Sequence, residues 1–402
     1  MAEQFDYKRA VAELNAKITG TEVAKVGLLT PLSLPGDLVA GELITKGVLL
    51  AVEYLRSSGL LRDNLDIELV VENDQALAAE EGMKKSVVAG FAKLAQIDKV
   101  IAILGQWHSR TAVEAVAISA KLDVPMFVQS GYDNFTKLGY RNIFRTYSTV
   151  EDRMFVMLDF LKEQGYQRIA CVASNTDFTR LVADDLDQVN KDGNYGFEIM
   201  RVEFDQETAT DIKPELQKVM DFKPDVVLND GVVRTNYLVI QQAAEIGLLP
   251  TTPMVTIFAY PTRTSDFWKE GGEAAEKLVW ASLLYRPGYE GLSNIGTWFT
   301  DTFRERYGIN PPNSALLSFA HMLFIGQGAS KAKDLTREAL IDSLESNEFE
   351  SWIGTVRFGQ TGDHLHHSPS PIVLMQYGEY KQDLKDAKVV YPKEYATGSY
   401  RK

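Results

Sequence analysis

The chain has 402 residues, of which 45% are hydrophobic and 24% are charged. This composition is typical of a globular protein and excludes a disordered or fibrous chain, and the length indicates two or three domains. The 42 basic and 55 acidic residues give a net charge of −13, which excludes a general affinity for nucleic acid or anionic membranes because these carry the same sign of charge.

No segment has the ~18 uninterrupted apolar residues of a membrane span. The amino-terminal stretch "MAEQFDYKRAVAELNAKI" carries acids and bases where a signal peptide has its apolar core. Two locations stay open: the periplasm or extracellular space if an export signal has been removed, and the cytoplasm otherwise. The single cysteine, Cys171, lies in the apolar run "RIACVA" and is predicted to be buried and inert.

An amphipathic segment comes first, at 5–18, and from Lys25 onward short apolar segments alternate with helical patterns. This alternation is typical of βαβ units around a parallel sheet. The first group is expected to contain strands at 25–29, 66–71, 99–104 and 125–129, with helices at 40–56, 77–95 and 110–121. The second group is expected to contain a helix at 151–163 and strands at 168–173, 196–204, 224–230, 253–259 and 278–284. Two sheets are therefore predicted.

Three helical patterns then follow one another, at 295–308, 314–330 and 336–346, before strands at 354–358 and 371–377. Helices without intervening strands must pack on an existing sheet, so the chain is expected to return to the first lobe and finish beside the second. The predicted fold class is α/β with two lobes, each a parallel sheet flanked by helices, joined by a multi-strand hinge. The predicted divisions are 24–146 and 285–352 for lobe 1, 147–284 and 353–402 for lobe 2, and 1–23 as an amino-terminal helical extension.

The turn from Gly105 to Ser109 lies where an open parallel sheet binds its ligands, beyond the carboxyl end of a strand. Ser109 is expected to cap the following helix, whose first backbone amides and partial positive charge attract an anion. A carboxylate fits there as well as a phosphate. The chain has no G-x-G-x-x-G or G-x-x-x-x-G-K-[ST] motif, which argues against nucleotide binding. Ser109 as a mere helix cap is the other interpretation.

Three further residues stand near this turn. Trp107 either forms the wall of an apolar pocket or covers the sheet edge. His108 beside Ser109 raises the possibility of a serine hydrolase, which the absence of a G-x-S-x-G motif and of a companion acid disfavours. The next loop, "VQSGYDNF", offers Ser130, Gly131 and Tyr132 at the end of the neighbouring strand, either as ligand contacts or as ordinary turn formers.

The tract "HLHH" at 364–367 suggests a metal site, but ligands from a single segment make a poor zinc site. A polar turn before the next strand is therefore the preferred interpretation. No cofactor and no metal are expected.

Nine segments in order, among them "KVGLLTPLSLPGDL", "AILGQWHSRTAVEAVAISAKLDVPMFV", "FRERYGINPP" and "WIGTVRFGQTGDHLHHSPSPIVLMQY", resemble the branched-chain amino acid binding proteins, the type I periplasmic solute-binding proteins of ABC importers. The resemblance runs from about residue 24 to 380. It implies a type I periplasmic binding protein fold whose lobes close on a small solute and present it to membrane permease subunits. It also implies that Ser109 and the helix amides hold the ligand carboxylate, with contacts from Ser130 and Tyr132.

The second lobe departs from the family pattern. Phe178 stands where the amino acid binders have a tyrosine, and Tyr260 or a neighbour stands where they have the glutamate that binds the ligand ammonium. An unpaired ammonium in a closed site is costly, so an α-amino acid ligand is in doubt. Asp230 is a candidate for the missing counter-charge and Arg234 for binding a second acidic group, or both form a solvated pair. Phe258 completes the predicted ligand-binding residues.

The sequence therefore predicts a non-enzymatic solute-binding protein for a small amphiphilic carboxylate, either a hydrophobic or aromatic amino acid or an aromatic or aliphatic acid. The expected partners are the small-molecule ligand and ABC permease subunits, with no nucleic acid and no insertion into a membrane. The alternatives are a cytosolic sensor of amides or amino acids on the same fold and, less favoured, the serine hydrolase.

Overall fold

The computed structural model describes residues 5–33, 37–75, 80–232, 234–257 and 267–402. It contains two compact units: unit 1 is Met1–Tyr147 with Glu290–Ser370, and unit 2 is Ser148–Tyr289 with Pro371–Lys402. The chain therefore passes between the units three times. Each unit carries its own sheet, which confirms the predicted two-lobed α/β fold class.

Unit 1 is built on a five-stranded sheet of order β2-β1-β3-β4-β5, in which every pair is parallel. The strands are β1 (Glu22–Thr30), β2 (Leu65–Asn73), β3 (Ala102–Gly105), β4 (Met126–Val128) and β5 (Ile143–Phe144). Four of them match the expected strands. β5 lies between the predicted strand at 125–129 and the predicted helix at 151–163, where no strand was expected, because two residues are too few to show a period.

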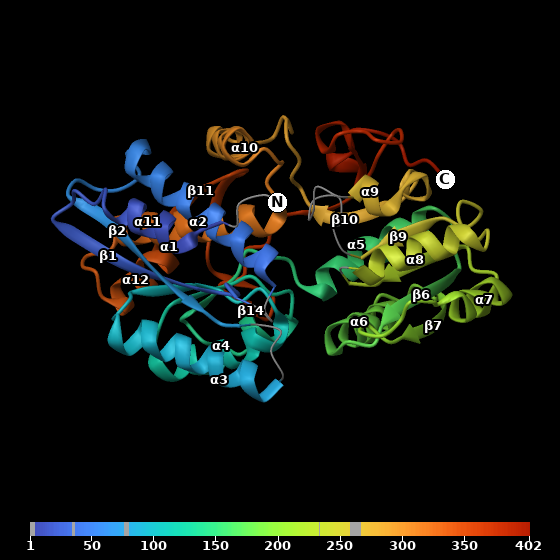
Figure 1. Ribbon diagram of the computed structural model, residues 1–402, viewed down its shortest axis with the longest axis horizontal. Coiled ribbons are helices and arrows are strands. Elements are labelled where there is room, and N and C mark those ends of the chain that lie inside the picture. The colour runs from blue at the N-terminus through green and yellow to red at the C-terminus, as the bar shows by residue number, and fades with distance from the viewer. Residues whose placement is uncertain (1–4, 34–36, 76–79, 233, 258–266) are drawn as a thin grey trace. The chain divides into compact units, whose positions relative to one another are not determined.

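Helices cover both faces of this sheet (Figure 1). Leu29 of β1 packs on one face with Phe91 and Val116, which belong to the helices of that layer. The helices of this face are α3 (Glu80–Ala92) and α4 (Ser109–Leu122), and those of the other are α2 (Leu38–Ser58) and α11 (Asn313–Lys331). Two more helices of unit 1 are α10 (Asn294–Tyr307) and α12 (Arg337–Ser346). Among the described helices, none has both the length and the apolar character required to cross a membrane.

The first helix, α1 (Tyr7–Asn15), protects the edge of the first sheet. The side chain of Asn15 both donates to the carbonyl of Leu69 (2.9 Å) and accepts from its amide (3.0 Å), so it satisfies the outer backbone groups of this residue of β2. Arg56 also donates to the carbonyl of Leu14 (2.8 Å). An uncovered edge strand is a template for aggregation. The amino-terminal segment, predicted as a helical extension, covers part of this edge and belongs to unit 1.

Unit 2 contains a seven-stranded sheet of order β16-β15-β10-β9-β8-β6-β7. The strands β7, β6, β8, β9 and β10 are parallel to one another, whereas β15 pairs antiparallel with both β10 and β16. The strands are β6 (Arg168–Ser174), β7 (Glu198–Phe204), β8 (Val226–Asp230), β9 (Met254–Thr256), β10 (Val279–Leu283), β15 (Ile372–Gln376) and β16 (Lys388–Tyr391). The helices are α5 (Val150–Glu163), α6 (Asp177–Asp192), α7 (Lys213–Phe222), α8 (Arg234–Glu245) and α9 (Phe267–Gly271).

The segment 353–370 belongs to unit 1, where the sequence had assigned it to lobe 2. The reason is local pairing: β11 (Glu348–Ser351) forms an antiparallel hairpin with β12 (Gly354–Arg357), and β13 (Gln360–Thr361) pairs with β14 (His364–Leu365). Short strands of this kind resemble the end strands of a sheet in their sequence, so composition does not reveal that they pair with each other and join neither large sheet.

Candidate functional site

The turn after β3 requires a glycine. Gly105 has φ +135°, and a Cβ atom at this position would lie 2.1 Å from the carbonyl oxygen of Leu29. The following Gln106 is also left-handed (φ +64°), and its buried side chain donates to Oδ2 of Asp74 (3.1 Å). The chain turns out of β3 at this close approach of two backbones. Residues 107–109 therefore lie beyond the end of the sheet, where side chains from neighbouring strands meet.

Ser109 is the first residue of α4, and the N-cap position is occupied by His108 (φ −88°, ψ 133°). The prediction that Ser109 caps the helix is therefore wrong by one position. A residue that already has helical dihedral angles does not direct its hydroxyl at the amides of its own first turn. The Ser109 Oγ atom instead lies 2.9 Å from the Oγ atom of Ser130, and His108 makes no side-chain cap hydrogen bond.

The predicted neighbouring loop does meet this turn. Gly105 and Val128 are partners in adjacent parallel strands, so the residues that follow each strand emerge at the same edge. Ser130 is buried and its Oγ accepts a hydrogen bond from the amide of Tyr132 (3.2 Å). Gly131 is buried as well. The two serine hydroxyls therefore form one polar cluster at the amino-terminal end of α4.

Two aromatic side chains flank this cluster in the chain. Trp107 is half-buried and therefore does not lie wholly within the core. Tyr132 is half-buried too, its ring centroid lies 5.1 Å from that of Phe135, and its hydroxyl accepts from Asn134 Nδ2 (3.4 Å). Each ring combines an apolar surface with a polar atom.

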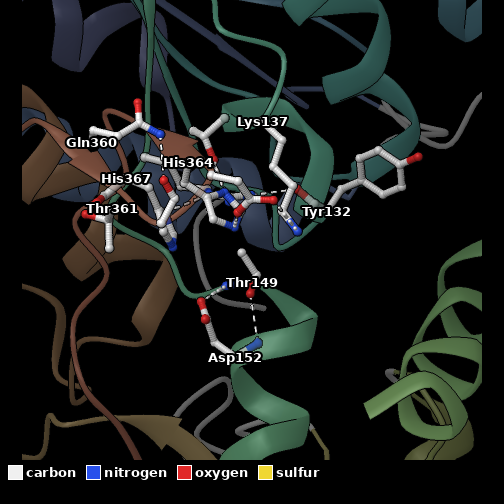
Figure 2. A network of polar contacts seen from close by, with 12 residues as sticks. Tyr132, Lys137, Thr149, Asp152, Gln360, Thr361, His364 and His367 are labelled. Carbon is white, nitrogen blue, oxygen red and sulfur yellow. Dashed lines mark hydrogen bonds and ion pairs between the residues drawn. The ribbon is translucent and has the colours of Figure 1, made fainter. Parts of the chain in front are cut away.

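A buried arginine, absent from the predicted site residues, supports the Tyr132 loop. Arg145 is 0% exposed, and it donates to the carbonyl oxygen of Tyr132 (2.6 Å), Oγ1 of Thr136 (2.8 Å) and Nδ1 of His367 (3.1 Å). Figure 2 shows Tyr132 and Lys137 near His364 and His367 within this network. The signal in the sequence was the arginine of "NIFRT", a charge directly after an apolar pair.

The three histidines of "HLHH" are not a solvated turn. His366 and His367 are buried, and the imidazole of His366 stacks on Phe144 with 4.4 Å between ring centroids. His364 Nδ1 lies 2.7 Å from Thr136 Oγ1, and burial lowers its pKa to about 4. The prediction of a polar turn is therefore wrong for these side chains, which belong to the interior of unit 1. Among the described residues, no group of three or more His, Cys, Asp or Glu side chains is arranged to hold a metal ion.

A fourth histidine, His321 of α11, is fully buried, and burial lowers its pKa to about 3. As the pH falls from about 6.5, the unfolded chain takes up a proton at this site before the fold does, so stability decreases with falling pH. One such group contributes about 1.4 kcal/mol per pH unit within this window. Urea unfolding across the window measures the slope, which the His321→Gln variant should reduce. An identical slope in the two proteins would contradict this assignment.

The predicted residues of unit 2 are distributed differently. Phe178 is half-buried in the first turn of α6 and packs against the core of the unit. Arg234 is exposed and donates to the carbonyls of Ala209 (3.0 Å) and Gln206 (3.3 Å). Phe258 and Tyr260 lie outside the described residues.

Asp230 ends β8 and is 0% exposed, so the interpretation as one half of a solvated pair with Arg234 is wrong for this carboxyl. Neither of its oxygens has a hydrogen-bond partner within the described ranges. Burial raises its pKa well above the usual value, opposed by the charge of Arg201. Every residue of β8 is buried, because the strand lies inside the seven-stranded sheet and both of its faces are covered.

The raised pKa of Asp230 predicts a pH effect of opposite sign to that of His321. The fold binds this proton more tightly than the unfolded chain, so the stabilisation is present below pH 3.8, the reference pKa, and is lost as the pH rises through the pKa of the folded state. Asp230→Asn removes the titration, and its advantage in unfolding free energy over the native protein should grow with pH by about 1.4 kcal/mol per unit. A constant difference between pH 4 and 7, measured by urea unfolding, would exclude a buried titrating carboxyl.

Comparison with known proteins identifies the fold family. A family model described as periplasmic binding protein matches residues 23–381. The leucine-binding protein LivK from Thermotoga maritima is 19% identical with a TM-score of 0.74, covering 90% of this chain and 98% of that one. LivJ from Streptococcus pneumoniae, solved with isoleucine, is 21% identical with a TM-score of 0.76, covering 92% and 100%.

A third similar structure is a solute-binding protein of an ABC transporter from R. palustris in complex with benzoate. It is 19% identical with a TM-score of 0.74, covering 94% of this chain and 98% of that one. These likenesses extend over nearly the whole of each chain and confirm the resemblance drawn from the sequence. Because the family match spans most of its length, the chain belongs to the periplasmic binding protein family.

Proposed function

We propose that this protein is the substrate-binding protein of an ABC importer and that its ligand is a small amphiphilic carboxylate. In this proposal the carboxylate binds unit 1 at the Ser109 turn, unit 2 closes over it, and the closed form is recognised by membrane permease subunits. A closed form that is populated only with ligand is a population shift and involves no bond chemistry. Family membership and the solved complexes of similar fold support the solute-binding role.

The observation that carries the proposal is the pair of hydroxyls at the start of α4. Ser109 Oγ and Ser130 Oγ lie 2.9 Å apart, and the amides of the first helical turn have no acceptor within the helix. Hydroxyl and amide donors together with the positive end of the helix dipole favour a negative group over a neutral one. A carboxylate with two oxygens can accept from both sources at once.

The remainder of the ligand is proposed to be apolar or aromatic and to lack an α-amino group. Trp107 and Tyr132 each stand two residues from one of the serines in the chain, and their half-buried rings offer apolar surface. Asp230, the acidic candidate for an ammonium, is fully buried, so its carboxyl oxygens are not accessible to a ligand cation. An ammonium without a counter-charge costs several kcal/mol to bury.

A thermal-shift panel of matched compounds tests both parts of the proposed ligand, the carboxylate and the absence of an α-amino group. The pairs are benzoate with benzamide, 4-methylpentanoate with leucine, and 3-phenylpropanoate with phenylalanine; the first differs in charge and the other two in the amino group. Ligand at 100 times its dissociation constant adds about 2.7 kcal/mol to the stability. We expect benzoate, 4-methylpentanoate and 3-phenylpropanoate to raise the melting temperature. Benzamide should not raise it, and leucine and phenylalanine should raise it less than the acids without an amino group.

Two outcomes would overturn the assignment in different ways. Equal stabilisation by benzamide and benzoate would contradict the carboxylate site, because a neutral amide does not use the helix dipole. Stronger stabilisation by leucine than by 4-methylpentanoate would leave the carboxylate site intact and contradict the exclusion of α-amino acids. Calorimetric titration of the best compound then supplies the affinity.

A further inference from the structure

Arg145 contacts the loop that carries Tyr132 and lies close to two of the places where the chain passes from unit 1 to unit 2, after Tyr147 and after Ser370. It follows β5 and precedes the passage after Tyr147 by two residues. Its backbone is bridged in parallel to His367, which precedes the passage after Ser370 by three residues. One buried side chain therefore belongs to the segment that enters unit 2 and contacts the loop that carries Tyr132.

Backbone hydrogen bonds directly connect the two segments that lead from unit 1 into unit 2, residues 145–147 and 366–370, here called the passage segments. The amide of Arg145 donates to the carbonyl of His366 (3.0 Å), and the amide of Ser368 donates to the carbonyl of Arg145 (2.9 Å). The amide of Ser370 donates to the carbonyl of Thr146 (3.2 Å). A displacement of either segment therefore displaces the other.

The guanidinium extends this connection to the ligand loop. Its rigid fork of donors reaches Tyr132 at one nitrogen, Thr136 at a second and His367 at the third. An arginine carries no acceptor, so His367 Nδ1 accepts and the imidazole is held with that nitrogen unprotonated. Removing a hydrogen-bonded charge from a buried site leaves several acceptors unsatisfied, so the three groups depend on Arg145 together.

We propose that Arg145 is a positioning residue that fixes the ligand loop at Tyr132 and couples its geometry to the two passage segments at 145–147 and 366–370. The inference rests on the proposed function only in so far as the Tyr132 loop contacts the ligand. Rigid passage segments that move with the binding loop are one means by which occupancy of unit 1 shifts the equilibrium between open and closed forms.

Hydrogen exchange of the ligand-free protein tests the coupling without knowledge of the ligand. In Arg145→Gln we expect faster exchange at the loop amides of Tyr132 and Lys137 and, together with them, at the passage amides of Ser368 and Ser370. Arg145→Lys keeps the buried charge, should fold, and should restore part of the protection at both places. This rescue distinguishes positioning from a loss of global stability.

Arg337 supplies the matched control. It is a half-buried arginine of unit 1 that donates to the carbonyls of Ala95, Val100 (3.1 Å) and Leu122 (3.3 Å), near the opposite ends of the strands. Arg337→Gln should raise exchange near Val124 and leave Ser368 and Ser370 protected. Equal loss of protection at the passage amides in both variants, or loss at the loop alone in Arg145→Gln, would overturn the coupling.

Affinity for benzoate and 4-methylpentanoate, measured by calorimetry on the folded variants, provides the functional measurement. Arg145→Gln should weaken whichever acid binds by at least about tenfold, Arg145→Lys by less, and Arg337→Gln by less than twofold. If the native protein binds neither acid, the proposed ligand class fails while the exchange result still decides the role of Arg145. Unchanged affinity in Arg145→Gln would overturn the positioning role.

Discussion

Replacing Ser109 by alanine should weaken the binding of a carboxylate ligand by about 10- to 150-fold, because a hydrogen bond to a charged group contributes about 1.5–3 kcal/mol. The side chain is the first of α4, and its hydroxyl pairs with that of Ser130 at 2.9 Å. Removing it takes away one donor and leaves the backbone amides of the helix in place. The fold should lose less than about 1 kcal/mol, since the position is half-buried and does not cap the helix.

Thr111 provides the control for this variant. It lies in the same first turn of α4, and its hydroxyl donates to the carbonyl of His108 (2.8 Å). Thr111→Val removes a hydroxyl from the same helix end without touching the serine pair and should leave the affinity within about twofold. Calorimetric titration of both variants with the best acid makes the comparison. Equal losses of affinity would attribute the effect to the helix end in general and contradict a specific role for Ser109.

Replacing Gly105 by alanine should lower the unfolding free energy by about 3 kcal/mol or more. The new Cβ atom would lie 2.1 Å from the carbonyl oxygen of Leu29, which is the backbone of the neighbouring strand and cannot move as a side chain can. The φ of +135° adds strain for any residue with a side chain. The turn that carries Ser109 would have to shift, so ligand affinity should fall in the same variant.

A control variant at Gly59 separates the steric clash from the backbone strain. It ends α2 with φ +75°, but a Cβ atom there would have no neighbour within 4 Å. Gly59→Ala should therefore cost only the conformational strain, about 1 kcal/mol, and leave ligand binding unchanged. Urea unfolding of both variants measures the difference. A cost at Gly105 no larger than that at Gly59 would contradict the close approach of β1 and β3.

The meeting of Ser109 and Ser130 could be predicted from the sequence, because parallel strands of known order bring their carboxyl ends to one edge. The cap position was wrong by one residue, since His108 and Ser109 both follow the strand and only the dihedral angles decide where the helix begins. The burial of Asp230 could not be predicted, because a polar residue at the end of an apolar strand is as often a loop residue. Nothing in the local pattern distinguishes the two.

The hydrogen-bond network of Arg145 could not be predicted from the local sequence either, for a different reason. Its partner His367 lies 222 positions away along the chain, and the tract "HLHH" has the polar composition of a turn. Whether a histidine of this tract is buried depends on residues far away in the chain, which for His367 include Arg145. Residues 353–370 were assigned to the wrong unit for a related reason, since strands of two to four residues carry too little periodicity to identify their partners.

A crystal structure of the protein with the acid that gives the largest thermal shift tests the carboxylate site most directly. It should place one carboxylate oxygen within about 3 Å of Ser109 Oγ and the other within reach of an amide in the first turn of α4. A ligand whose carboxylate contacts neither Ser109 nor these amides, while the hydroxyls of Ser109 and Ser130 contact only each other, would contradict the carboxylate site.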